Sequence, residues 1–227
     1  MLELIIQNHH DAVEAEKLGA TRLEFVSAIS EGGLTPSYGA MKKVFQSVDI
    51  PVFTMIRPHS FSFVYDETDF EIIEEDVRSV LELGGTRIVF GALHEDGTIN
   101  EEMLQRVFDI SPNIEMTFHR AFDSARDQIE AYKMLVKYDQ LKWILTSGGA
   151  DTCSEGKDML RKLVELSNEL AGPQILPGSG LSSDNLADIH QVVKAGQYHF
   201  GSAVRKDKSF AKGYDPEVME EIIKILT

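Results

Sequence analysis

The chain has only one cysteine, Cys153, among its 227 residues. A single thiol cannot form an internal disulfide, and scarce cysteine is typical of proteins from a reducing compartment. No apolar stretch approaches the length of a membrane span, and we recognise no signal peptide before the first strand-like run. These absences predict a cytoplasmic protein with no membrane partner.

Basic residues are also scarce, because 22 lysines and arginines stand against 37 acidic residues and give a net charge of −15. Nucleic acids and anionic membranes both need a basic surface, so this balance argues against either partner. The acidic residues are spread along segments with helical periodicity, which indicates a solubilising surface. The hydrophobic share of 43% is ordinary for a soluble globular protein.

The chain lacks a linker, a low-complexity segment and an obvious short repeat, so we expect one domain over residues 1–227. Short runs rich in Ile, Val, Leu and Phe predict strands that are buried on both faces. The runs are Leu2–Ile6, Arg22–Ser27, Pro51–Arg57, Arg87–Ala92, Glu115–Arg120, Trp143–Ser147, Gln174–Pro177 and Tyr198–Ser202. Segments with helical periodicity fill the gaps. This alternation predicts an α/β fold, a single (β/α)8 TIM barrel, with an open doubly wound sheet as the alternative.

Several patterns predict where the helices begin and end. Thr35-Pro36 and Asp215-Pro216 each place a capping residue before a proline at the first helical position. Thr68 and Glu71 have the spacing of a capping box, and the helix that they open is predicted to end at Gly84.

Charged residues gather at the end of the fifth predicted strand, in the segment Thr117–Asp123. The carboxyl ends of parallel strands converge on the ligand sites of α/β folds. Thr117 and His119 share one face of the strand, so His119 is expected at the barrel mouth as a general base, general acid or metal ligand. The alternative is a core histidine bonded to a carboxylate. Asp123 is expected either to orient His119 or to cap the next helix.

Two other strands carry charged residues that need partners. Glu24 lies within the second strand and Glu3 within the first, and a buried carboxylate is costly unless it is paired. They form either a polar layer paired with arginine or part of a site. Arg57 ends the third strand, and its guanidinium suits Glu24 or an anionic substrate. The candidate catalytic residues are Glu24, Arg57, His119 and Asp123.

Glycine-rich loops follow the last three predicted strands. Barrels that bind phosphorylated substrates often use the loops after strands seven and eight, although glycine also occurs simply because turns need it. Ser147, after strand six, is a weak nucleophile candidate and fits a ligand-binding loop better. The candidate substrate-binding residues are Arg120, Ser147, Gly178, Ser179, Gly180, Gly201 and Ser202. No HxxxH or CxxC pattern identifies metal ligands, and His9-His10 are expected on the surface.

The chain resembles the copper homeostasis protein CutC family over almost its whole length. The motifs that carry the resemblance are Ser30–Ser37, Met55–Pro58, Phe90–Leu93, Glu95–Gly97, Thr117–Asp123, Thr146–Gly148 and Pro177–Gly180. The resemblance implies a cytoplasmic (β/α)8 barrel, often a homo-oligomer, that handles or binds copper. It also implies a shared pocket, lined by Glu24, Arg57, His119, Arg120, Asp123 and Ser147.

This sequence departs from the family pattern at two places. Relatives often have cysteine at the positions of Ile5 and Val26, and Cu(I) prefers such thiolate ligands. Relatives also carry a histidine two residues before the serine of strand eight, where this chain has Phe200. His199 is one place away and is expected to face the other side of the strand. Both departures count against copper binding by this protein.

Three functions therefore stay open. The first is metal handling of the copper homeostasis type, with copper as the ligand. The second is a barrel enzyme acting on a small anionic metabolite, phosphorylated or carboxylated, with His119 as acid/base, Glu24 as its carboxylate partner and Arg57 as the substrate clamp. The third is a structural or interaction barrel with a vestigial site.

Overall fold

The computed structural model describes residues 1–227, and its eight parallel strands form one sheet that curves into a barrel. The strands are β1 (Leu2–Ile6), β2 (Arg22–Phe25), β3 (Val52–Met55), β4 (Arg87–Phe90), β5 (Glu115–Phe118), β6 (Leu141–Thr146), β7 (Gln174–Pro177) and β8 (Tyr198–Phe200). Hydrogen-bonded neighbours run β7-β6-β5-β4-β3-β2-β1-β8. A parallel bridge between Gly178 and His199 joins the two ends of this order. The predicted (β/α)8 barrel is confirmed, and the doubly wound alternative is wrong.

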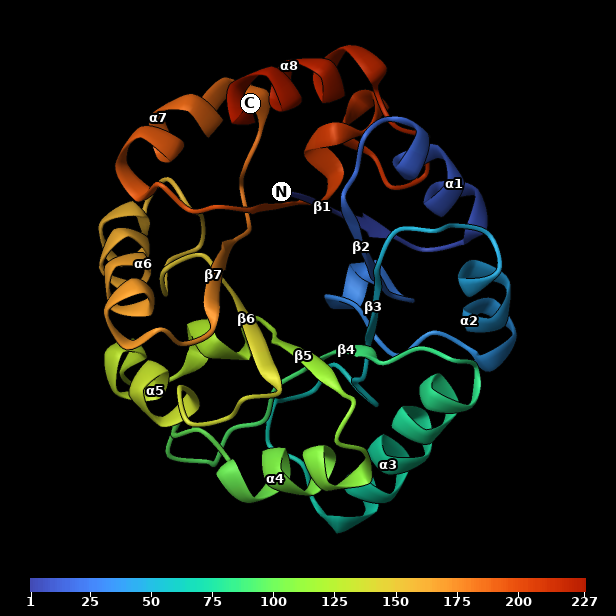
Figure 1. Cartoon of the computed structure of the whole chain (residues 1–227), viewed down its shortest axis with the longest axis vertical. Helices are drawn as coiled ribbons and strands as arrows, with labels where there is room; N and C mark the ends of the chain where they lie inside the picture. Colours follow the sequence, from blue (N-terminus) through green and yellow to red (C-terminus); the bar gives the residue numbers. More distant parts are fainter.

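Eight helices cover the outside of the sheet, as Figure 1 shows, and α8 lies between α7 and α1 in the ring. They are α1 (His9–Lys17), α2 (Tyr38–Phe45), α3 (Glu67–Glu82), α4 (Glu101–Ile110), α5 (Gln128–Leu135), α6 (Lys157–Leu170), α7 (Ser183–Val193) and α8 (Pro216–Leu226). Short 3₁₀ helices lie in the loops after β2, β5 and β8: η1 (Ile29–Glu31), η2 (Arg120–Ser124), η3 (Ser202–Val204) and η4 (Lys206–Lys208). None of the helices has the length and apolar character that a membrane crossing requires.

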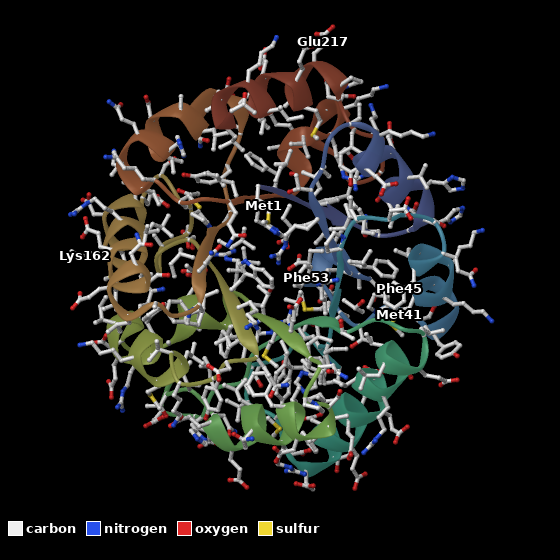
Figure 2. The ribbon with its side chains drawn as sticks, viewed as in Figure 1. Met1, Met41, Phe45, Phe53, Lys162 and Glu217 are labelled. Carbon is white, nitrogen blue, oxygen red and sulfur yellow. The ribbon has the colours of Figure 1, made fainter.

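The apolar core has two parts of very different size. A cluster of 50 buried residues fills the layer between strands and helices, whereas the cluster inside the barrel has five, Ile5, Val26, Phe53, Met55 and Val89. Figure 2 shows Phe53 within the ring of strands. Burial between strands and helices therefore supplies most of the hydrophobic stabilisation. The barrel interior has room for a polar layer.

Two of the predicted helix starts are wrong because a nearby side chain is the better cap. Ser37 caps α2 by accepting a hydrogen bond from the Ala40 amide, while the Thr35 hydroxyl accepts from the Arg57 amide at 2.9 Å. Asp66 and Asp69, rather than Thr68 and Glu71, form the capping box of α3. A carboxylate at each position suits the positive end of the helix.

The other helix boundaries agree with the sequence patterns. Asp215 caps α8, with Pro216 as its first residue. Gly84 follows α3 with φ +85°, a left-handed conformation that glycine adopts without strain at a helix end.

Candidate functional site

A cavity of about 510 Å³ opens at the carboxyl ends of the strands. It is lined by residues from β1, β2, β3, β6 and β8 and from the loops that follow the strands, including the loop after β5. The predicted site residues among them are Glu24, Arg57, His119, Arg120, Ser179, Gly180, Gly201 and Ser202. Asp123, Ser147 and Gly178 are not in the lining. A pocket of this size suits a small organic ligand better than a bare ion.

Glu3, Glu24 and His199 form one side of the interior, which we call the carboxylate wall. Each is a buried residue, and one donor atom from each lies within 4.8 Å of the others. Strand register brings them together, because Glu3 pairs with His199 across β1 and β8, and Ile5 pairs with Glu24 across β1 and β2. Arg22 forms a salt bridge with Glu3, and the central carbon of its guanidinium lies 3.6 Å from the ring centroid of Phe53.

His199 is held in one orientation by a hydrogen bond at one of its two ring nitrogens. Nδ1 lies 2.7 Å from Oε1 of Glu3, a hydrogen bond in which the imidazole N–H donates to the carboxylate. Nε2 therefore faces Glu24, whose Oε2 is 3.9 Å away, too far for a direct hydrogen bond. The other oxygen of Glu24, Oε1, is buried without any hydrogen-bond partner. A buried carboxylate oxygen without a protein partner can accept a hydrogen bond from a ligand or coordinate an ion.

Two members of the carboxylate wall, Glu24 and His199, have raised pKa values. Burial raises the pKa of Glu24 to about 7, and the charge of Glu3 adds to the rise while His199 and Arg22 oppose it. Burial would lower the pKa of His199, but Glu24 and Glu3 outweigh it and raise that pKa. Glu3 goes the other way: its burial is outweighed by Arg22 and His199, which keep its pKa below the usual value. Glu3 is therefore the ionised member.

The expectation that His199 faces away from the site is wrong. Tyr198 bonds His190 of α7 and Phe200 joins the core between strands and helices, so His199 between them points into the barrel. The sequence signal was the alternation of polar residues at 197 and 199 with aromatic residues at 198 and 200.

Arg57 and His119 form a second wall, which we call the arginine wall. The guanidinium of Arg57 donates to the carbonyl oxygens of Glu31, Gly33 and Ser60 at 3.1–3.4 Å. No carboxylate is paired with it. The expected pairing of Arg57 with Glu24 is wrong, because backbone carbonyls of the loops after β2 and β3 take its hydrogen bonds instead.

His119 is a neutral hydrogen-bond donor in this wall. The Ala121 amide donates to its Nδ1 at 3.2 Å, so the ring proton must be on Nε2. Nε2 is buried and has no partner. Burial and the nearby charge of Arg57 lower the pKa of His119 to about 3. Glu24 is not its carboxylate partner, and an imidazole this hard to protonate is a poor acid or base at neutral pH.

Asp123 and Ser147 organise the loop after β6. Asp123 accepts hydrogen bonds from the amides of Ser147 and Gly149 and from the hydroxyls of Thr146 and Ser147. Arg120 donates to the same carboxylate at 2.8 Å. Asp123 neither orients His119 nor caps the next helix, since Asp127 caps α5. Both expected roles for Asp123 are therefore wrong, and its contacts fix a loop.

The glycine loops take different positions. Gly178 pairs with His199 at the seam of the barrel, and an added Cβ there would lie 2.5 Å from Leu145 and 3.0 Å from His199. Glycine at 178 is therefore needed for the close approach of β7 to β8. Ser179 donates to the carbonyl of Asp151 at 2.8 Å, so its hydroxyl is occupied. Gly180, Gly201 and Ser202 face the cavity.

No thiolate reaches the cavity. Ile5 and Val26 belong to the apolar cluster inside the barrel. Cys153 is fully buried, and burial together with the charge of Asp123 raises its pKa to about 12, so it remains a thiol. The donor atoms that the cavity offers are oxygen, imidazole nitrogen and the thioether sulfur of Met55, and none is a thiolate. Carboxylate and imidazole ligands suit Cu(II) or Zn(II), whereas Cu(I) prefers sulfur.

Comparison with known proteins shows consistent similarity to one family. The model of the CutC family matches residues 1–204. The copper homeostasis protein cutC homolog of Homo sapiens is 36% identical over 207 residues, covering 91% of this chain and 75% of the relative. A family protein CutC from Treponema denticola is 33% identical, covering 93% of this chain and 85% of that protein.

Solved structures give the same result. A crystal structure of a copper homeostasis protein CutC from Streptococcus agalactiae matches with a TM-score of 0.82 and 29% identity, covering 88% of this chain and 97% of that one. Phosphoribosylanthranilate isomerase from Pyrococcus furiosus matches with a TM-score of 0.65 and 15% identity over the whole of this chain and 98% of that one, a likeness of fold alone. The family match over nine tenths of the sequence, with the strand-end motifs in place, means that this chain belongs to the CutC family.

Proposed function

We propose that this protein acts in copper homeostasis by binding a divalent metal ion, Cu(II) in the first instance, between Glu24 and His199. The observation that carries the proposal is the pair of facing, buried donor atoms: an unpartnered carboxylate on Glu24 and Nε2 of His199 at 3.9 Å from its other oxygen. Copper handling is what the names of the relatives state. The donor set on this chain favours the divalent ion.

Glu3 has the supporting role in this site. Its two oxygens are already used by Arg22 and by Nδ1 of His199. A carboxylate that accepts the second ring proton of a metal-binding histidine fixes the tautomer and makes the other nitrogen a better ligand. The ion would therefore have two direct protein ligands, Glu24 and His199, and further ligands must come from outside the chain.

Binding of a metal at this wall must release protons. The raised pKa values of Glu24 and His199 mean that protons compete for the same two donor atoms near neutral pH. Metal affinity should rise with pH through this range. The enzyme alternative, with His119 as acid/base, is less favoured because that imidazole stays neutral and its Nδ1 is occupied.

The test is a titration of the reduced, metal-free protein with Cu(II), Zn(II) and Cu(I), each against a competing chelator. We expect one equivalent of Cu(II) or Zn(II) to bind. Glu24→Gln or His199→Asn should weaken binding by roughly 100-fold, the upper end of what loss of even an outer-shell partner costs. The control is the double variant His9→Asn, His10→Asn, which removes two adjacent surface imidazoles that lie 3.9 Å apart.

The control separates the buried site from adventitious binding at the surface. If the His9/His10 variant loses the metal and Glu24→Gln keeps it, the proposal is wrong. Tight binding of Cu(I) alone would also contradict it, since the cavity offers no thiolate. The cytoplasmic location and homo-oligomeric assembly stay predictions, which cell fractionation and light scattering of the purified protein can test.

A further inference from the structure

The chain has three buried arginines, and two of them have a carboxylate partner. Arg22 is paired with Glu3, and Arg205 is paired with Asp11 at 2.7 Å. Arg57 is also buried, at 7% exposed, and forms no salt bridge. A buried guanidinium without a counter-ion is unfavourable, because the carbonyl dipoles that accept from its two terminal nitrogens do not neutralise its charge. Its Nε is buried without any hydrogen-bond partner.

The missing counter-ion has a place to bind, because Arg57 lines the cavity at the barrel mouth. The rings of Phe63 and His119 lie beside the Arg57 guanidinium and form the sides of a candidate anion site. Phe63 lies 4.9 Å from the Arg57 guanidinium and 5.0 Å from the ring of His119, so one aromatic side chain contacts both members of the arginine wall. Gly32 leaves the guanidinium accessible, since an added Cβ there would lie 3.1 Å from Nη1.

His119 adds a second donor directed at the same ligand. Its Nε2–H is buried without an acceptor, although the residue also lines the cavity. Leaving a buried donor without a partner is unfavourable, so an acceptor on the ligand is expected to restore the hydrogen bond. A neutral N–H beside a guanidinium is a combination that binds an oxyanion, not a cation.

We propose that Arg57 and His119 bind the carboxylate or phosphate group of a small molecule that also coordinates the metal ion on the opposite wall. The second half of this inference rests on the proposed function. Two protein ligands leave open positions on the ion, and about 510 Å³ is far more space than an ion needs. The ligand is accordingly a metal chelate of a small molecule, whose metal ion binds the carboxylate wall and whose oxyanion group binds the arginine wall.

The oxyanion site is tested without any metal. Protein freed of metal on a chelating resin is titrated calorimetrically with citrate and, separately, with inorganic phosphate, which distinguishes a carboxylate site from a phosphate site. We expect at least one of them to bind with a millimolar or lower Kd. His119→Ala and Arg57→Lys should each weaken that binding at least tenfold, because the first removes the N–H and the second the guanidinium fork.

Arg87→Gln is the matched control for loss of positive charge, since Arg87 is paired with Glu115 on the exposed surface and does not line the cavity. Its anion affinity should stay within twofold of the parent. Because Arg57 also holds the loop at Glu31–Gly33, the melting temperature of Arg57→Lys is measured first. If that variant does not fold, His119→Ala, which keeps the charge, decides the outcome.

The two proposals fail in distinguishable ways. A protein that binds Cu(II) but neither anion keeps the metal site and overturns the oxyanion site. A protein that binds citrate or phosphate, with loss in His119→Ala, but binds no metal keeps the oxyanion site and overturns the chelate. Equal anion binding by the parent, His119→Ala and Arg57→Lys overturns the assignment of these two residues.

Discussion

The two histidines of the cavity have opposite surroundings. His199 lies against two carboxylates, which raise its pKa, whereas His119 lies beside Arg57, and its pKa is lowered to about 3. Both are buried and both line the same cavity. Burial disfavours the charged form of both imidazoles, and only His199 has carboxylates that outweigh it, so His199 suits a cation and His119 an anion. Residue type and position at a strand end alone do not distinguish the ligand preferences of the two histidines.

The two walls also differ in what holds them. The carboxylate wall rests on strand register, with Glu3, Arg22 and His199 on paired strands. The arginine wall depends on loops, because the carbonyls that hold Arg57 belong to residues 31, 33 and 60. Sheet positions are the more rigid of the two, so we expect the metal side to be preformed and the oxyanion side to adjust to its ligand.

The largest effect should follow from breaking the carboxylate wall at Glu3. Glu3→Gln leaves the buried Arg22 without its counter-ion and should destabilise the protein by about 3–5 kcal/mol. Urea unfolding, with the midpoint and slope fitted together, measures the change. The comparison variant is Glu115→Gln, whose partner Arg87 is 39% exposed.

The partly exposed Arg87–Glu115 pair should contribute about 0–1 kcal/mol to the free energy of unfolding. If Glu3→Gln cost no more than Glu115→Gln, the carboxylate wall would not depend on its salt bridge. Binding provides a second readout, since Glu3→Gln should also weaken metal affinity by removing the acceptor for Nδ1 of His199.

The two walls should also differ in how their contribution to the free energy of unfolding depends on pH, an effect smaller than that of Glu3→Gln. Because the pKa of Glu24 rises from 4.5 to about 7 on folding, the folded state binds a proton that the unfolded state has lost. Its contribution is complete below about pH 4.5 and is lost as pH rises to about 7, a change on the order of 3 kcal/mol. Glu24→Gln should flatten the stability curve in this window.

His119 should act in the opposite direction. Its pKa falls from 6.5 to about 3 on folding, so the unfolded state takes up the proton first and stability is lost as pH falls below about 6.5. His119→Ala should remove that acid-side slope and leave the slope from Glu24. Urea unfolding at pH 4–8 of both variants checks this. Parallel curves for the two variants would contradict the opposite surroundings of the walls.

The sequence was sufficient for the barrel and for the location of the site. Apolar runs with helical segments between them predict the strands to within about two residues, because strands buried on both faces leave little choice of residue. Arg57 and His119 were expected at the carboxyl ends of their strands and Glu24 within the second strand, and all three line the cavity.

The partners within the site could not be predicted in the same way. Alternation gives the face of a strand residue, but the contacts of Arg57 are with loop carbonyls, which follow no periodicity. His199 was missed because it stands one place from the histidine position of the family pattern, and an offset of one residue predicts a side chain on the other face of the strand. The tautomer of His119 depends on one amide, that of Ala121, whose direction is set by the turn into η2.

Cys153 should have the smallest effect, although it is the only thiol in a protein of a copper homeostasis family. It lies outside both walls, and its amide donates to the carbonyl of Ser179 at 3.0 Å. A thiol with a pKa of about 12 has almost no thiolate at neutral pH, and thiolate is the metal ligand. Cys153→Ala should leave metal affinity within twofold and cost about 1 kcal/mol of stability through lost packing.

The same competition titration with Cu(I) and Cu(II) measures this, with urea unfolding alongside. A large loss of Cu(I) affinity in Cys153→Ala would mean that the loop around Ser179 opens to expose the sulfur, and that the ion binds there instead of at Glu24. Loss confined to Glu24→Gln and His199→Asn would show that oxygen and imidazole are sufficient. A family member without cysteines in its first two strands would then bind its metal as the divalent ion.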